Sequence, residues 1–182
     1  MKTIKLFFAI TLLSFLTSNA QITEGNWMVG GDLNYSNFKS SYKGNLSSES
    51  NSLIISPNIG YFFSNNFVIG IKGNFGFVKQ VGSDSSKSII ISPFLRYYFL
   101  KPEKLVNVFI DASYGYGIGK TGNDDVQTSK NYNFKAGPVV YFNSSVGLEF
   151  AINYGSSISS TESKYDNLSL SLGFQIHLEK QQ

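Results

Sequence analysis

The chain has 182 residues, with 15 Lys and Arg against 12 Asp and Glu, one His and no Cys. A chain without Cys has no disulfide framework, thiolate metal site or thiol nucleophile. Charged residues make up 15% of the chain, below the roughly 25% of ordinary soluble domains. Mean hydropathy is −0.06, and after residue 20 no apolar run reaches the ~18 residues that a spanning helix needs. Composition therefore excludes a helical membrane protein, but allows one that alternates apolar and polar residues.

The first twenty residues have the order of a secretory signal peptide. Lys2 and Lys5 precede an apolar run over 6–16, and small residues Ser18 and Ala20 follow. This order predicts a signal peptide over 1–20, cleaved between Ala20 and Gln21, with an N-terminal core helix as the alternative. The two lysines supply two of the three net positive charges, so the charge indicates no nucleic-acid partner.

Residues 21–182 are predicted to form a single all-β domain. Alternate residues are apolar or glycine, and never charged, in eight segments: 27–35, 53–63, 67–77, 89–99, 108–118, 132–142, 146–154 and 168–178. A period of two over so many segments predicts β-strands. The intervening positions are mostly Gly, Ser and Asn, whereas a soluble sandwich or lipocalin would need an outer face rich in Lys and Glu. A transmembrane barrel has the inverse arrangement, with apolar residues toward lipid and polar ones inside.

The connections between the segments alternate in length. Short links at 64–66, 101–104 and 143–145 alternate with longer polar links at about 39–51, 79–87, 120–130 and 156–167. Outer-membrane barrels have short periplasmic turns and longer extracellular loops. We therefore predict an eight-stranded antiparallel transmembrane β-barrel in the bacterial outer membrane, with both termini periplasmic. Outward aromatic residues gather near both ends of the segments, as expected of two lipid–water interfaces.

Three segments that descend to short links contain a proline followed by aromatics: Pro57, Pro93 and Pro138. A strand proline removes a ladder donor and is normally confined to edges or bulges. A closed barrel has no edge, so a bulge or local kink is expected at each proline.

These features resemble the small outer-membrane barrels that include the OmpX-like and OmpA-like eight-stranded barrels of Gram-negative bacteria. The resemblance covers essentially all of 21–182 and includes no sharp functional motif. It implies outer-membrane lipid and the barrel-assembly machinery as partners. One departure concerns the end of the last strand, where such barrels often have a terminal aromatic and this chain has Leu178 followed by 179–182.

Six charged residues fall on the inner face of the predicted strands. They balance in charge and are Asp32, Lys72, Arg96, Asp111, Lys135 and Glu149. An eight-stranded barrel is only wide enough for its own side chains, and charges buried there must be paired. We predict that they form a structural charge network, with Arg96 and Asp111 as the favoured pair. The functional alternative is a narrow ion path or a small internal binding site.

No catalytic or metal constellation emerges from the sequence. His177 is the single His and is expected to be a satisfied strand residue, so a Ser-His-Asp triad is not assembled. The Gly-rich run 115–119 lacks the spacing and following helix of a phosphate loop, and Asp124-Asp125 alone is a poor divalent-cation site. We therefore expect no enzymatic activity, cofactor or metal.

Two functions remain open from the sequence. The first is a monomeric, non-enzymatic barrel with a plugged lumen, acting as a structural or surface-interaction protein through extracellular loops whose partner the sequence does not identify. The alternative is a narrow channel or small-solute transporter across the outer membrane.

Overall fold

The computed structural model describes residues 22–42 and 45–178 of the chain, which form a closed antiparallel barrel of eight strands in sequence order. The predicted signal peptide and the departure after Leu178 lie outside these residues. The strands are β1 (Trp27–Tyr42), β2 (Asn45–Ser64), β3 (Phe67–Gln80), β4 (Ser86–Tyr98), β5 (Val106–Thr121), β6 (Gln127–Tyr141), β7 (Val146–Ser159) and β8 (Lys164–Leu178). Within the described ranges no helix has the length and apolarity to cross a membrane.

Each predicted segment falls on one strand, except that Phe99 and Phe142 lie one residue beyond the ends of β4 and β6, and its alternation corresponds to the two faces of the barrel. On β5, for example, Asn107, Phe109 and Asp111 are buried, whereas Val108 and Ile110 are exposed. The apolar residues therefore form the outer wall. Apolar contact with lipid and polar contact with a narrow lumen explain why these sequences form strands of an inverted barrel.

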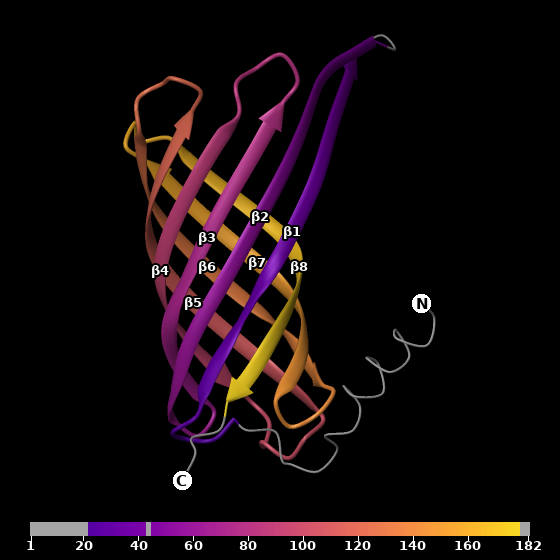
Figure 1. Ribbon diagram of the computed structural model, residues 1–182, viewed down its shortest axis with the longest axis vertical. Helices are drawn as coiled ribbons and strands as arrows, with labels where there is room; N and C mark the ends of the chain where they lie inside the picture. The colour runs from indigo at the N-terminus through magenta and orange to yellow at the C-terminus, as the bar shows by residue number, and fades with distance from the viewer. Residues whose placement is uncertain (1–21, 43–44, 179–182) are drawn as a thin grey trace, which may run out of the picture.

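The two ends of the barrel differ in their connections. The short-turn end has the links 65–66, 99–105 and 142–145, and β1 begins and β8 ends there, with Trp27 opposite Leu178 (Figure 1). At this end Asn66 adopts a positive φ of 69° in the tight turn between β2 and β3. In the link 142–145, between β6 and β7, the Asn143 side chain accepts hydrogen bonds from the backbone N–H groups of Ser145 and Val146. The opposite end is called the long-hairpin end below.

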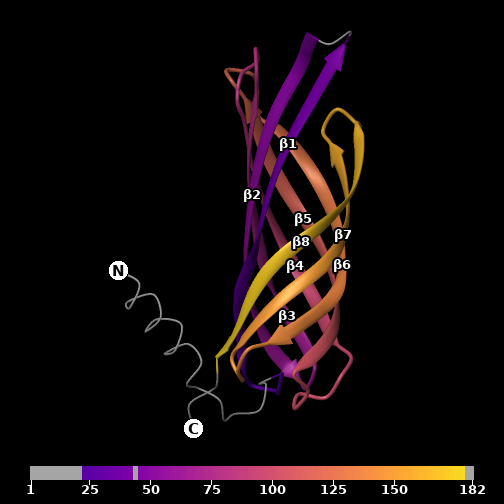
Figure 2. The same ribbon diagram turned by 90° about the vertical axis from the view of Figure 1, so that its right-hand side faces the viewer.

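The prediction of long loops at the long-hairpin end is partly wrong. Much of 39–51 and 156–167 is paired strand, and β1 pairs with β2 as far as Tyr42 and Asn45. The β1–β2 hairpin projects beyond the others (Figures 1 and 2). Backbone pairing needs no apolar alternation, so the polar ends of these strands gave no periodic signal.

The prolines interrupt pairing without the expected bulges. Pro57, Pro93 and Pro138 keep register with the preceding strand, opposite Gly31, Ile71 and Val108. Pairing with the following strand lapses at each proline and resumes in the same register. The missing N–H thus removes ladder bonds on one side only, and no extra residue is inserted. The register shifts lie elsewhere, between Ser40 and Ser41 and between Phe62 and Ser64.

Outer aromatic residues form a belt along β1–β4 at the short-turn end. The Trp27 and Tyr61 rings are 5.3 Å apart, Phe67 contacts both Phe63 and Tyr97, and Tyr97 contacts Phe99. Across β5 and β6, toward the long-hairpin end, the Tyr114 and Tyr132 rings are 5.0 Å apart. Aromatic rings in these positions are favoured at the two lipid–water interfaces.

Candidate functional site

The lumen brings the six inward-facing charges into one connected chain of ion pairs. Lys72 lies 2.6 Å from Asp111, and Arg96 Nε lies 3.1 Å from the other Asp111 oxygen. Arg96 Nη1 also lies 2.5 Å from Glu149 Oε1. Lys135 continues the chain, 2.9 Å from Glu149 and 2.8 Å from Asp32. The order along the chain is Lys72–Asp111–Arg96–Glu149–Lys135–Asp32, with cations and anions alternating.

The central residues of this series of ion pairs are buried away from water. Arg96, Asp111 and Glu149 are at most 2% exposed, whereas the Asp32 side chain, at one end of the chain, is 18% exposed. Each central group contacts two opposite charges, so its charge is compensated on both sides. Buried ions are tolerated under this condition because pairing and hydrogen bonding offset their desolvation.

Aromatic rings support the cations. The Arg96 guanidinium lies 4.4 Å from the Phe109 ring centre, and Lys135 Nζ lies 5.4 Å from the same ring. Lys72 Nζ lies 5.1 Å from the Phe94 ring centre. Arg96 also donates to the Tyr98 hydroxyl at 3.2 Å. Cations over ring faces gain electrostatic stabilisation, which is larger in a dry site.

A glycine leaves space for Asp32, the anion at one end of the series of ion pairs. A Cβ on Gly173 would overlap the Asp32 carboxylate and lie 3.0 Å from the Gly31 carbonyl oxygen. Gly173 faces Asp32 across the β1–β8 ladder and Glu149 across the β7–β8 ladder. The glycine therefore provides the space through which Asp32 reaches Lys135.

Below the charges, at the short-turn end, an apolar floor fills the lumen. Its members are almost completely buried and include Ile22, Met28, Phe62, Val68, Tyr98, Phe109, Val139 and Tyr141. The segment before β1 joins this floor, because Asn66 N donates to Ile22 O and Gly25 N donates to Phe62 O. The sequence predicted a polar or small inner face throughout, and that prediction did not include this apolar layer. Adjacent aromatics such as 61–63 and 97–99 signal it, since neighbouring strand residues point to opposite faces.

His177 lies within the floor, at edge-to-face geometry 5.3 Å from Phe62 and near Tyr98 and Tyr141. Neither ring nitrogen has a hydrogen-bond partner among the described residues, so the expected satisfied histidine is instead held by aromatic contacts. No serine or carboxylate is hydrogen-bonded to this ring in the described part of the chain. The geometry therefore lacks the base–nucleophile contact that a triad requires.

Above the charges, the lumen is lined mainly by neutral polar and small residues, with Ile54 and Ile90 among them. Ser56 bonds Asn74 at 2.8 Å, and Asn153 donates to Ser171 at 2.8 Å. The Gly-rich run 115–119 lies on β5, where Gly115 and Gly117 are buried and face Ser92 and Ser129. The lumen thus has three layers: neutral polar, charged and apolar.

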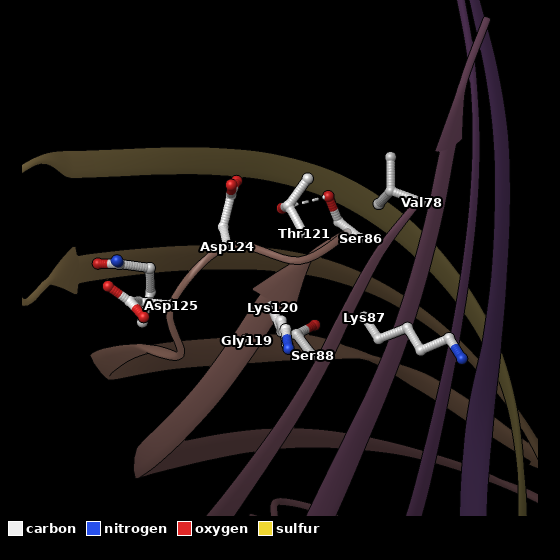
Figure 3. A pocket seen from close by; sticks show the side chains of 10 residues that line it. Val78, Ser86, Lys87, Ser88, Gly119, Lys120, Thr121, Asp124 and Asp125 are labelled. Atoms are coloured by element: carbon white, nitrogen blue, oxygen red, sulfur yellow. Dashed lines mark hydrogen bonds between the residues drawn. The ribbon is translucent and has the colours of Figure 1, made fainter. Parts of the chain in front are cut away.

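A depression of about 530 Å³ lies at the rim of the long-hairpin end (Figure 3). Asp124 and Asp125 line it with Lys87 and Lys120, and the Ser86 and Thr121 hydroxyls, on paired positions of β4 and β5, are hydrogen-bonded at 2.7 Å in its wall. Among the described residues no three His, Cys, Asp or Glu side chains are grouped as a metal site would require. The described residues at this rim therefore include both acidic and basic side chains but no group of side chains arranged to bind a metal ion.

Three solved structures share the fold of this chain. Neisserial surface protein A is 18% identical, with a TM-score of 0.60 over 84% of this chain and 99% of that one. The N-terminal β-barrel domain of Pseudomonas aeruginosa OprF is 14% identical, with a TM-score of 0.58 over 85% and 98%. Outer membrane protein OprG from Pseudomonas aeruginosa is 12% identical, with a TM-score of 0.55 over 87% and 98%.

Comparison with curated protein sequences gives no significant match. The family of the outer membrane protein beta-barrel domain matches residues 6–177, nearly the whole chain. The closed eight-stranded barrel, its inverted polarity and this match agree on fold and location. The chain is therefore a member of the outer membrane protein beta-barrel domain family and belongs to the bacterial outer membrane.

Proposed function

We propose that this protein is a non-enzymatic outer-membrane barrel with a blocked lumen that interacts with other molecules through its long hairpins. The observation that carries the proposal is the connected chain of ion pairs above a fully buried apolar floor. Both termini would then lie in the periplasm and the long hairpins outside the cell.

Both layers oppose the passage of solutes. A water-filled path would have to pass Met28, Phe62, Tyr98 and His177, each 0% exposed. It would also have to separate Arg96 from Glu149 or Asp111, leaving buried charges without partners. Breaking such a pair is strongly unfavourable because the desolvated charge loses its compensation.

Planar-bilayer conductance tests the blocked lumen. Purified wild-type protein is expected to give no stable open-channel steps, with a large general porin as the positive control. Reproducible single-channel steps from folded wild-type protein would contradict the blockage and favour the narrow-channel alternative. Tyr61→Ala is a useful control variant, because Tyr61 packs on Trp27 in the outer belt and its loss should leave conductance unchanged.

The interaction role rests on the projecting β1–β2 hairpin (Figure 2). Replacing 38–50 by a two-residue turn keeps Asn37 opposite Asn51 and so removes the projection while leaving the ion pairs and the floor in place. A surface partner that co-purifies with wild-type protein and is lost with the trimmed variant would support the role. Equal recovery of the same partners by the wild-type and trimmed proteins would argue against this hairpin as the interaction surface.

A further inference from the structure

The ladder that closes the barrel, between β1 and β8, is the shortest of the eight. It pairs Trp27–Leu33 with Leu172–Leu178 and goes no further. Beyond it, β1 continues on β2 as far as Tyr42, and β8 continues on β7 as far as Lys164. Both ribbon views show β1 and β8 diverging toward the long-hairpin end (Figures 1 and 2). Each strand therefore has one edge without a partner strand in the described chain.

The open part of this seam begins inside the hydrocarbon region. Leu170 and Leu168 face outward opposite Ile152 and Tyr154 of β7. They are 74% and 72% exposed, against 46% for Leu172, where the seam is closed. Across the seam, Leu33 and Tyr35 are 60% and 66% exposed. The excess exposure of these four apolar residues marks the place of a missing neighbour.

Lipid cannot satisfy the backbone hydrogen-bonding groups along the unpaired edges of β1 and β8. Backbone N–H and C=O groups of an unpaired edge have no partner in hydrocarbon, which is why membrane-spanning sheets are normally closed. One side-chain bond crosses the open seam, from Asn34 Nδ2 to the Leu170 carbonyl oxygen at 3.4 Å. Acyl chains offer neither donors nor acceptors, whereas a β-strand offers both at the required spacing. The fitting occupant is therefore another strand.

The two open edges are complementary to each other. Continuing the register of the closed part places Asn34 opposite Ser171, Tyr35 opposite Leu170 and Lys39 opposite Asp166. The match is good nearest the closed part, where Asn34 meets Ser171 and Tyr35 meets Leu170, and it is interrupted where Asn37 meets Leu168 and Phe38 meets Asn167. At the rim Lys39 and Asp166 carry opposite charge, and each also pairs within its own chain, with Glu49 and Lys164. Opposite charges on facing strand positions favour pairing. An edge of β1 is therefore suited to an edge of β8.

We propose that two copies of this chain associate in the membrane, with the open edge of β1 in each copy pairing with the open edge of β8 in the other. A twofold axis along the membrane normal would bring both pairs together at once and satisfy all four edges. Within one copy the same edges belong to hairpins that diverge, so self-closure requires both hairpins to bend. This association does not depend on whether the lumen is blocked, and it revises the expectation of a monomer.

Disulfide trapping tests the association, because the natural chain has no Cys. Ser36 and Ser169 would face each other on the continued register. Membranes containing a tagged Ser36→Cys chain and an untagged Ser169→Cys chain are oxidised mildly and analysed without reductant. The expected product is a linked dimer of one tagged and one untagged chain. Ser113→Cys on β5 replaces Ser169→Cys as the matched control and should give none, since it lies in the same lumen away from the seam.

The double variant Ser36→Cys/Ser169→Cys separates the outcomes. Linked dimers support the association. A link formed within single chains only would show that the seam closes on itself and would overturn it, as would unlinked protein with a monomer mass in mild detergent. Heat-modifiable gel migration shows that each variant is folded.

Charge reversal gives an independent readout. Lys39→Glu should weaken dimer formation roughly two- to fivefold, the effect of one cross-strand charge pair. Glu49→Gln, which removes the partner of Lys39 within its own hairpin, is made in every chain compared so that the reversal adds no repulsion there. Lys39→Glu with Asp166→Lys should restore it. Unchanged dimer yield in the single reversal, together with no recovery in the double, would overturn the proposed register.

Discussion

Arg96 on β4 reaches across the lumen to Glu149 on β7, with 2.5 Å between Nη1 and Oε1. The same guanidinium contacts Asp111, and Glu149 also contacts Lys135. These two residues therefore connect the two halves of the charge chain, and the loss of either divides it.

Removing the guanidinium should destabilise the barrel. In Arg96→Ala, the ion pairs left among the described residues are Glu149 with Lys135 and Asp111 with Lys72, and the Phe109 ring loses the nearer of its two cations. Breaking a buried pair costs about 3–5 kcal/mol when the site stays dry, and less when water enters. The unfolding midpoint in urea should fall well below that of Lys164→Ala, whose side chain is 57% exposed. Equal midpoints for the two variants would contradict a structural role for the network.

The two ends of the charge chain should respond differently to loss of an anion. Glu149 is 0% exposed and contacts two cations, whereas Asp32 is partly exposed and, within the described ranges, pairs with one cation, Lys135. Glu149→Gln should therefore lower the unfolding midpoint more than Asp32→Asn. Water can compensate the freed Lys135 near Asp32 but has less access to Arg96. A larger effect from Asp32→Asn would show that the better-hydrated end carries more of the stability.

Gly173 should tolerate no side chain without movement of Asp32. A Cβ there overlaps the Asp32 carboxylate, whereas a Cβ on Gly155 meets only ordinary contacts at 3.7 Å or more. Gly173→Ala should cost about 1–3 kcal/mol, as typical overpacking does, and Gly155→Ala should cost much less. Unfolding of both variants in the same detergent measures the difference. Adding Asp32→Ser to Gly173→Ala should recover part of the loss if the overlap is its cause.

The period of two predicted the barrel because lipid imposes it on every strand, and it placed the six charges on the inner face. Several features had no such signal. Polar strand ends beyond the membrane, such as those around Lys39 and Lys164, have water on both sides and lose the alternation. The apolar floor was missed because Phe62 and Tyr98 stand between outward aromatics and merge with them in the sequence. The short β1–β8 ladder joins the two ends of the chain, and local pattern contains no information on where that pairing stops.

Orientation in the membrane can be tested with single cysteines, because the natural chain has none. Ser83 lies in the β3–β4 link at the long-hairpin end, and Glu103 lies in the short link between β4 and β5; both are exposed. With periplasmic termini, a membrane-impermeant maleimide should label Ser83→Cys on intact cells and label Glu103→Cys only after the outer membrane is permeabilised. Both sites should react equally in detergent, which controls for accessibility. Labelling of Glu103→Cys but not Ser83→Cys on intact cells would reverse the proposed orientation and place the short turns, rather than the hairpins, at the cell surface.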